Sequence, residues 1–382
     1  MSTERADVVI IGGGCTGTSA AYHLCAAGVK NVLLLEMSYL CSGATGRCGG
    51  GMRAQWSTRC NIQLAKYSLD AFGRFSDEIG QDIELHLGGY LLPAFNPQMA
   101  GEFRKNIVLQ NALGVPSTFV PTEAIRSLAP IIETDTMLGA AYCATDGKSN
   151  PFLTVKGYAE RARALGARIM TDTTVTGFKM AHGRIESVVT SRGRIDAGWV
   201  VNAAGAYAAN IAALAGAIVP ITPYRHQALV TERVAHCFNP MFINLYESLY
   251  FSQTKNGAFV MGQTDKHEIP GFNYRSHWLF ELELARKVMK FAPILRHVRV
   301  VRHWAGHYAM TPDRQPIIGP CPGVGNMLIA SGYSGHGYML APASGRIVAD
   351  LITRGSVDFV DMNEFSMDRF KSKLYVVEAD IV

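Results

Sequence analysis

Three glycines follow an apolar run near the start of the chain. Gly12, Gly14 and Gly17 have the spacing G-x-G-x-x-G and come directly after Val8–Ile11. In a dinucleotide site the first glycine permits a tight turn, the second lets a pyrophosphate approach the backbone, and the third lets a helix pack on the strand. The helix N-terminus then directs N–H groups at the diphosphate. The spacing by itself also fits a tight turn in an ordinary β-α-β unit.

An acidic residue completes this unit. Glu36 follows the apolar run Val32–Leu35, where a carboxylate can accept hydrogen bonds from an adenosine ribose. Gly28 suits the end of the helix between the two strands. With these parts in register the sequence predicts dinucleotide binding, with Cys15 and Thr16 in the first turn of the helix. The position of the unit, early in the chain, favours FAD over NAD(P).

A second loop, residues 42–53, combines five glycines with two arginines and several hydroxyl side chains. Such a loop can donate hydrogen bonds to phosphates and run its backbone along a flat ring system, whereas a plain surface loop rarely has this composition. The cofactor contacts that we expect from it are Ser42, Ala44, Thr45, Arg47, Cys48, Gly49, Gly51 and Met52.

Two later segments place small residues after an apolar strand. The first follows an expected strand at 198–202, and a nearby ligand or simple tight packing explains it equally well. The second is the loop 332–337, before an expected helix at about 340–354 whose positive end can face a ring carbonyl. The contacts that we expect from these segments are Ala203, Ala204, Gly205, Gly332, Ser334, Gly335, His336, Gly337 and Tyr338.

Composition sets the class of protein. The chain has 382 residues, 48% apolar and 18% charged, so we expect a large core and two domains. The net charge of +5 is slight and scattered, which argues against a nucleic-acid partner. None of the eight cysteines forms C-x-x-C, so no metal site is expected. The charged N-terminal residues do not resemble a signal peptide, and we expect reduced thiols in the cytoplasm.

The uncharged run 197–224 is long enough to suggest a membrane span. It contains two asparagines and two prolines, and its many alanines and glycines contribute little insertion energy. We therefore expect a buried strand and a helix at about 206–217 there, and no transmembrane segment.

The order of elements predicts an α/β (α+β) fold, in which a Rossmann-like FAD-binding domain carries an inserted antiparallel-sheet substrate domain. Strands are expected at 173–178, 184–190 and 194–201 in the first domain, and a hairpin around Lys255-Asn256-Gly257 in the second. The expected ranges are 1–87, 145–221 and 304–382 for the FAD-binding domain, and 88–144 and 222–303 for the substrate-binding domain.

With these motifs the chain resembles the D-amino-acid-oxidase-type FAD-dependent oxidoreductases over nearly its whole length. The strings 46–49, 223–227, 302–306 and 331–342 are most similar to the β subunit of heteromeric L-proline dehydrogenase, and sarcosine oxidase β subunits are also similar. The resemblance implies oxidation of the C–N bond of an amino or imino acid, such as L-proline or sarcosine, by hydride transfer to flavin N5. It also implies flavin contacts from Val175 and Gly306.

The chain departs from its relatives at three informative positions. Tyr308 stands where glycine-oxidase-like members carry the arginine that holds the substrate carboxylate, so we expect Arg53 or Arg302 to replace it; each arginine could instead form a structural ion pair. Gly306 stands where monomeric sarcosine oxidases carry the cysteine that tethers FAD, which implies non-covalent FAD. Their oxygen-activating lysine aligns near Val260, which favours a dehydrogenase.

The resemblance places His226 and Tyr250 above the flavin, although either residue also fits an ordinary core position. The expected catalytic residues are therefore His226, Tyr250, Arg53, Arg302 and Tyr308.

The relatives imply partners. A β subunit of this kind works with an α subunit, in some cases with a small further subunit, and an FMN can lie at the subunit boundary. This chain has one dinucleotide fingerprint, so a second flavin would be shared at an interface. Two alternatives stay open: a self-standing amino-acid oxidase that produces hydrogen peroxide, and a non-catalytic flavin-binding scaffold subunit.

Overall fold

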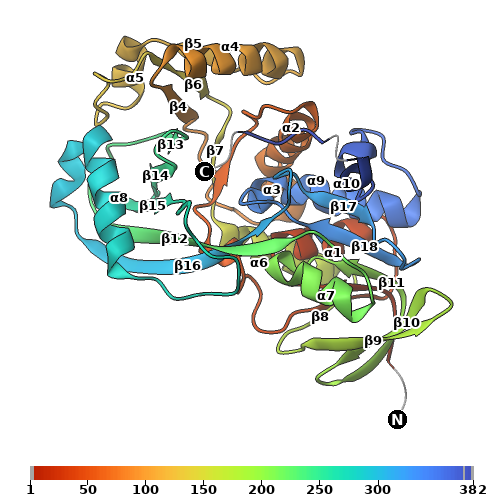
Figure 1. Cartoon of the computed structure of the whole chain (residues 1–382). Coiled ribbons are helices and arrows are strands. Elements are labelled where there is room, and N and C mark those ends of the chain that lie inside the picture. The colour runs from red at the N-terminus through yellow and green to blue at the C-terminus, as the bar shows by residue number, and fades with distance from the viewer. Residues whose placement is uncertain (1–3, 373–374, 380–382) are drawn as a thin grey trace.

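The first of two eight-stranded sheets is built around a buried parallel core (Figure 1). The structure is a computed structural model that describes residues 4–372 and 375–379. The sheet has the order β17-β18-β11-β1-β2-β8, and β10 and β9 extend it from β11. Its strands are β1 (Glu4–Ile11), β2 (Val32–Leu35), β8 (Arg168–Met170), β9 (Val175–Ala181), β10 (Arg184–Thr190), β11 (Gly193–Asn202), β17 (Ile317–Pro320) and β18 (Met327–Ser331).

β1 lies at the centre because its second half is apolar on both faces. It pairs in parallel with β11 and β2, and Val9 and Ile10 are fully buried. Two helices, α1 (Cys15–Ala26) and α9 (Gly337–Thr353), pack together on this sheet. Their approach is close, since a Cβ on Gly345 of α9 would stand 2.2 Å from the hydroxyl oxygen of Ser19.

The second sheet has the order β16-β12-β15-β14-β13-β4-β6-β5 and is antiparallel except for the parallel pair β13–β4. Helix α8 (Trp278–Phe291) covers one face, at the left of Figure 1, with Phe280, Leu284 and Val288 buried in the same core as strand residues. The strands are β4 (Tyr90–Ala94), β5 (Thr118–Val120), β6 (Gly139–Cys143), β12 (Thr222–Arg233), β13 (Met241–Asn244), β14 (Leu249–Gln253), β15 (Ala258–Gln263) and β16 (Val300–Met310).

Short elements complete the described chain. The ribbon β3 (Gly51–Met52) pairs with β7 (Gly147–Lys148). The remaining α-helices are α2 (Arg59–Gly73), α3 (Phe75–Ile79), α4 (Pro97–Ala112), α5 (Thr122–Leu128), α6 (Pro151–Ala164), α7 (Ala208–Leu214) and α10 (Arg369–Ser372). No helix within residues 4–372 and 375–379 is long and apolar enough to span a membrane.

β16 runs across residue 304, where we expect the division between the domains, and pairs with β12 along nearly its whole length, from Val300 to Met310. Two helices have other bounds than those expected. The helix expected at 340–354 begins earlier, at Gly337. The helix expected at 206–217 is the shorter α7, preceded by a 3-10 turn at Gly205–Tyr207.

Candidate active site

One cavity takes its lining from both sheets. The turn after β1, the loop 42–53, the residues after β11 and the loop after β18 contribute from the first part of the fold. Strands β12, β13, β14 and β16 contribute from the second. Among the described residues, no three His, Cys, Asp or Glu side chains gather as a metal site.

The glycine turn forms one end of this cavity. Gly12 has a φ of 114°, which favours glycine, and a Cβ there would stand 2.4 Å from the Ala203 carbonyl oxygen. A Cβ on Gly17 would stand 1.9 Å from the Gly12 carbonyl oxygen, so α1 must pack on the turn without a side chain. Gly14 is the N-cap of α1, and the Cys15 N–H donates to the Thr45 hydroxyl at 3.2 Å.

The Glu36 carboxylate ties the turn to the next loop. It accepts the Gly13 N–H at 2.7 Å, the Ser38 N–H at 2.9 Å and the Ser42 hydroxyl at 3.2 Å. Glu36 is buried and lines the cavity. A single carboxylate therefore shapes both the turn and the start of the loop 42–53.

Arg47 joins the loop 42–53 to β16. Its guanidinium donates to the Ser42 and Ala305 carbonyl oxygens at 3.2 and 2.9 Å, and the Trp304 indole N–H donates to the Arg47 carbonyl oxygen at 2.9 Å. A Cβ on Gly306 would stand 3.1 Å from the Arg47 Cβ. Arg47 is thus a structural link as well as part of the cavity lining.

Three parallel rings form the wall of the cavity that strands β12, β14 and β16 supply. The His226 imidazole lies between the phenol rings of Tyr308 and Tyr250, with centroid distances of 4.2 and 5.9 Å and an interplanar angle of 8° in both cases. Two glycines make room for the phenols: a Cβ on Gly262 would stand 2.6 Å from the Tyr250 hydroxyl, and one on Gly335 would stand 2.5 Å from the Tyr308 ring.

Burial keeps these rings uncharged. It lowers the pKa of His226 from 6.5 to about 4, and it raises the pKa of Tyr250 and of Tyr308 well above 10. The His226 Nε2 atom is buried without a hydrogen-bond partner in the part of the chain that the structure describes. A buried polar atom of this kind, facing a cavity, favours a bound ligand.

Arg53 brings positive charge to the same pocket. Its guanidinium stacks on the Trp56 ring, with Cζ 3.7 Å from the ring centroid, and donates to the Gln55 carbonyl oxygen. Arg53 is 3% exposed and lines the cavity together with Tyr90, Met241 and Ile243. The pocket therefore combines one buried cation with an aromatic and aliphatic lining.

Most residues expected from the sequence line this cavity. They are Gly12, Gly14, Cys15, Thr16, Glu36, Ser42, Ala44, Thr45, Arg47, Cys48, Gly49, Gly51, Ala203, Ala204, Gly205, Gly306, Ser334, Gly335, His336, Gly337, Tyr338, Arg53, His226, Tyr250 and Tyr308.

Five expected residues lie elsewhere. Arg302 is exposed near the start of β16 and does not line the cavity, whereas Arg53 does. The other four pack behind the lining: Gly17 against the turn, Met52 against the Ser149 hydroxyl, Val175 in the core of the first sheet, and Gly332 against Thr311.

Sequence reasoning missed the residues that complete the substrate end of the pocket. Trp56 lies three residues after Arg53, the last residue of the glycine-rich loop, and this closeness in the sequence was a usable signal. Tyr90 lies on β4, and Met241 and Ile243 lie on β13. Their meeting depends on the parallel pairing of β4 with β13, which no local pattern announces.

The donor set fits FAD. The glycine turn leaves room for a pyrophosphate at the N-terminus of α1, and Glu36 offers acceptors where an adenosine ribose would lie. The small residues 203–205 and the loop 334–337 leave space for a flat ring beside the pocket of Arg53 and His226.

The chain belongs to the FAD dependent oxidoreductase family, whose pattern it matches over residues 7–351. The structure of L-proline dehydrogenase from P. horikoshii is 34% identical, with a TM-score of 0.93 and coverage of 98% of this chain and 100% of that one. These findings confirm the family and the fold class that the sequence predicts, and they show an FAD-dependent oxidoreductase.

Two curated relatives show how far the likeness extends. Sarcosine oxidase subunit beta of Rhodobacter capsulatus is 26% identical, over 98% of this chain and 91% of that protein. Mitochondrial dimethylglycine dehydrogenase of Rattus norvegicus is 29% identical, over 96% of this chain and 45% of that protein. The chain thus spans a little under half the length of the mitochondrial relative.

Proposed function

We propose that this chain oxidises the C–N bond of a small amino or imino acid, with a secondary amine such as L-proline or sarcosine as substrate. The observation that carries the proposal is the buried Arg53 guanidinium in an aromatic pocket that is continuous with the FAD cradle. The names of the relatives, which include a proline dehydrogenase and a sarcosine oxidase subunit, support the same choice.

The pocket residues have separate tasks in this proposal. Arg53 holds the substrate carboxylate through charge-assisted hydrogen bonds. The rings of Tyr308, His226 and Tyr250 form an apolar wall for the carbon atoms of the substrate. Because burial excludes water, the amine of the substrate stays neutral and keeps its lone pair.

The same residues do not need to remove a proton from carbon. The phenols keep their protons, since burial raises their pKa, and His226 is neutral at physiological pH. Bound FAD would supply the acceptor for the hydride that leaves the carbon next to nitrogen. The neutral amine then becomes an iminium ion, which gives the imine when its N–H proton passes to water. The chain's own residues therefore orient the substrate and protect it from water.

We further propose that the chain is the catalytic β subunit of a heteromeric dehydrogenase. Its likeness to a sarcosine oxidase subunit over nearly the whole of both chains supports this role. The absence of a lysine near Val260, where the resemblance places the oxygen-activating lysine, supports an acceptor other than oxygen. An α subunit, and an FMN at the boundary between the subunits, complete the proposal.

An anaerobic substrate screen tests the reaction. The FAD-loaded protein is mixed with L-proline, hydroxyproline, sarcosine and dimethylglycine, and bleaching of the flavin absorbance is followed. We expect bleaching by at least one of these amines, and Arg53→Met as the matched control should bleach only at much higher concentration. A wild-type protein that binds FAD but is bleached by none of them would favour the scaffold alternative.

Co-purification from the native cell tests the assembly. We expect a complex with a second chain that contains FMN as well as FAD. A single-chain species with full turnover on oxygen and release of hydrogen peroxide would instead identify a self-standing oxidase.

A further inference from the structure

A buried carboxylate lies in the last described segment of the chain. Residues 375–379, here called the C-terminal strap, are mostly exposed, yet Glu378 is 0% exposed. An isolated carboxylate is costly to bury unless several donors surround it. Its partners therefore show what the strap holds in place.

Four of the hydrogen bonds to this carboxylate come from residues at the start of α2. It accepts the Ser57 N–H at 3.2 Å, the Ser57 hydroxyl, the Thr58 hydroxyl at 2.8 Å and the Asn61 amide at 3.0 Å. Thr58 is the N-cap of α2, but its side chain makes no cap bond, and the first turn holds no acidic residue. Glu378 thus supplies the negative charge that a helix N-terminus favours.

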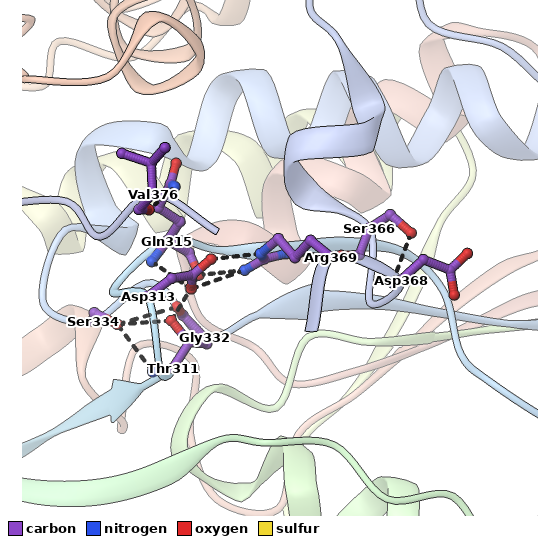
Figure 2. A network of polar contacts seen from close by, with 9 residues as sticks. All are labelled: Thr311, Asp313, Gln315, Gly332, Ser334, Ser366, Asp368, Arg369 and Val376. Atoms are coloured by element: carbon purple, nitrogen blue, oxygen red, sulfur yellow. Dashed lines mark hydrogen bonds and ion pairs between the residues drawn. The ribbon is translucent and has the colours of Figure 1, made fainter. Parts of the chain in front are cut away.

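The C-terminal strap is also held by Asp313 and Gln315, which lie outside α2. The Glu378 N–H donates to the Asp313 carbonyl oxygen at 3.0 Å, and the Gln315 amide donates to the Val376 carbonyl oxygen at 2.7 Å. Figure 2 shows the Arg369 guanidinium aimed at the Asp313 carboxylate, which it meets at 2.6 Å. These contacts hold the strap over α2.

The segment 53–58 connects the residues that Glu378 holds, Ser57 and Thr58, with the cavity residues Arg53 and Trp56. At its start, the buried Asp146 carboxylate accepts the Ala54 N–H at 2.8 Å and the Gln55 amide at 3.0 Å. At its end, Glu378 holds Ser57 and Thr58. Two buried carboxylates therefore bracket the short loop that contains Arg53 and Trp56.

The bracketed loop determines where Arg53 points. The Trp56 indole N–H donates to the Arg53 carbonyl oxygen at 3.1 Å, while the guanidinium stacks on the same ring. The Trp56 ring also contacts the His336 ring, with centroids 4.6 Å apart, and His336 lines the cavity. A shift of the loop at Ser57 would therefore move Trp56 and disturb its contacts with Arg53 and with His336, which both line the cavity.

We propose that Glu378 is a positioning residue, which acts through Ser57 and Thr58 to hold the segment 53–58 so that Arg53 and Trp56 face the cavity. Its effect on substrate binding rests on the proposed function. Its effect on the order of the loop does not rest on that function. A failure of the positioning role of Glu378 can therefore be told apart from a failure of the proposed function.

Hydrogen exchange of the full-length FAD-loaded protein tests the order of the loop. Glu378→Ala should raise amide exchange in the peptide 53–62 by at least about tenfold, since local opening becomes easier when four hydrogen bonds are lost. With an amine that is turned over, the KM should rise by about tenfold while kcat stays within about threefold. Glu378→Gln, which keeps an acceptor oxygen, should restore most of both values.

Asn96→Ala is the matched control. Asn96 caps α4 by accepting the Met99 N–H at 2.9 Å, so its loss also weakens a helix N-terminus, but Asn96 does not line the cavity and does not contact Glu378. It should leave the exchange of 53–62 and the KM unchanged. The proposal is overturned if Glu378→Ala leaves the exchange of 53–62 unchanged, or if Asn96→Ala raises it equally.

Thr58→Val provides a second route if Glu378→Ala does not fold. It removes one donor to the carboxylate and should raise exchange of 53–62 by about threefold. Unchanged exchange in this variant would also count against the proposal. If the wild-type protein oxidises no amine, the exchange result still decides the role of Glu378, and only the KM comparison is lost.

Discussion

The His226 imidazole and the Tyr308 phenol ring stack with their centroids 4.2 Å apart and their planes 8° from parallel. They come from the neighbouring strands β12 and β16, in which His226 pairs with Gly306. Because Gly306 has no side chain, nothing on that residue separates the rings from the cradle. The stacking therefore places a neutral imidazole flat against the Tyr308 ring.

Two arginines allow a matched test of carboxylate binding. Arg53→Met should raise the apparent substrate constant by about ten- to a hundredfold, because a charge-assisted hydrogen bond contributes roughly 1.5–3 kcal/mol. Arg302→Met is the control, since Arg302 is exposed and outside the cavity, and it should behave as wild type. Steady-state kinetics of both variants measure the difference, and equal effects would remove Arg53 from this role.

Glu36 offers a test of cofactor binding. Glu36→Ala should weaken FAD binding by at least about tenfold, because the carboxylate orders both the Gly13 turn and the Ser42 loop. Quenching of flavin fluorescence during titration of the apoprotein gives the Kd. Asp7→Asn, which removes an exposed carboxylate from β1, should leave the Kd unchanged. An unaltered Kd for Glu36→Ala would contradict the assignment.

A single methyl group at Gly17 should block the cradle. The added Cβ would stand 1.9 Å from the Gly12 carbonyl oxygen, and backbone atoms cannot move aside as a flexible side chain can. We expect Gly17→Ala to lose FAD and to unfold at a lower temperature. Gly101→Ala, in open space on α4, should raise stability by about 0.5–1 kcal/mol. Thermal unfolding and flavin content of both proteins provide the comparison.

Two histidines with lowered pKa values should make the fold sensitive to acid. Burial lowers the pKa of His226 and of His23 from 6.5 to about 4, so between these values the unfolded chain binds protons that the folded chain does not. Stability is therefore retained above pH 6.5 and lost as the pH falls toward 4, by about 3 kcal/mol for each imidazole. Urea unfolding across this range measures the slope, and His226→Gln should make it shallower. An identical slope in that variant would show that His226 does not contribute.

FAD should be released by denaturation without proteolysis. The reason is that Gly306 cannot form the thioether to FAD that the resemblance assigns to the aligned cysteine of monomeric sarcosine oxidases. Acid precipitation followed by absorbance of the supernatant is the measurement. Yellow colour that stays with the precipitate would show a covalent bond at another residue.

The parts of the site whose residues lie close together in the sequence could be predicted from it. Gly12, Gly17 and Glu36 belong to one β-α-β unit, so their spacing, taken together with the two apolar runs and the helix between them, indicates a dinucleotide site. Arg302 shows the limit of this reasoning. It is an even number of residues away from Gly306 and Tyr308 along β16, so it belongs to the same face of the strand. However, it lies at the exposed start of the strand, beyond the end of the cavity.

The remaining lining depends on which distant strands become neighbours. Tyr90 pairs with Met241 only because β4 lies in parallel beside β13. The contact of Glu378 with Ser57 likewise joins segments from opposite ends of the chain. Local periodicity carries no information on such pairings, since burial of the combined surface determines them.

The assembly of the first sheet from distant segments affects how the protein is made. β1 and its glycine turn leave the ribosome long before β11, and β18 and α9 follow much later still. Throughout this interval the nascent chain carries β1 without its partner β11, and an apolar strand with one edge unpaired favours aggregation. The cavity also takes lining from the loop after β18 and from the first residues of α9, so the cradle is complete only after these late segments have packed on α1 and its sheet.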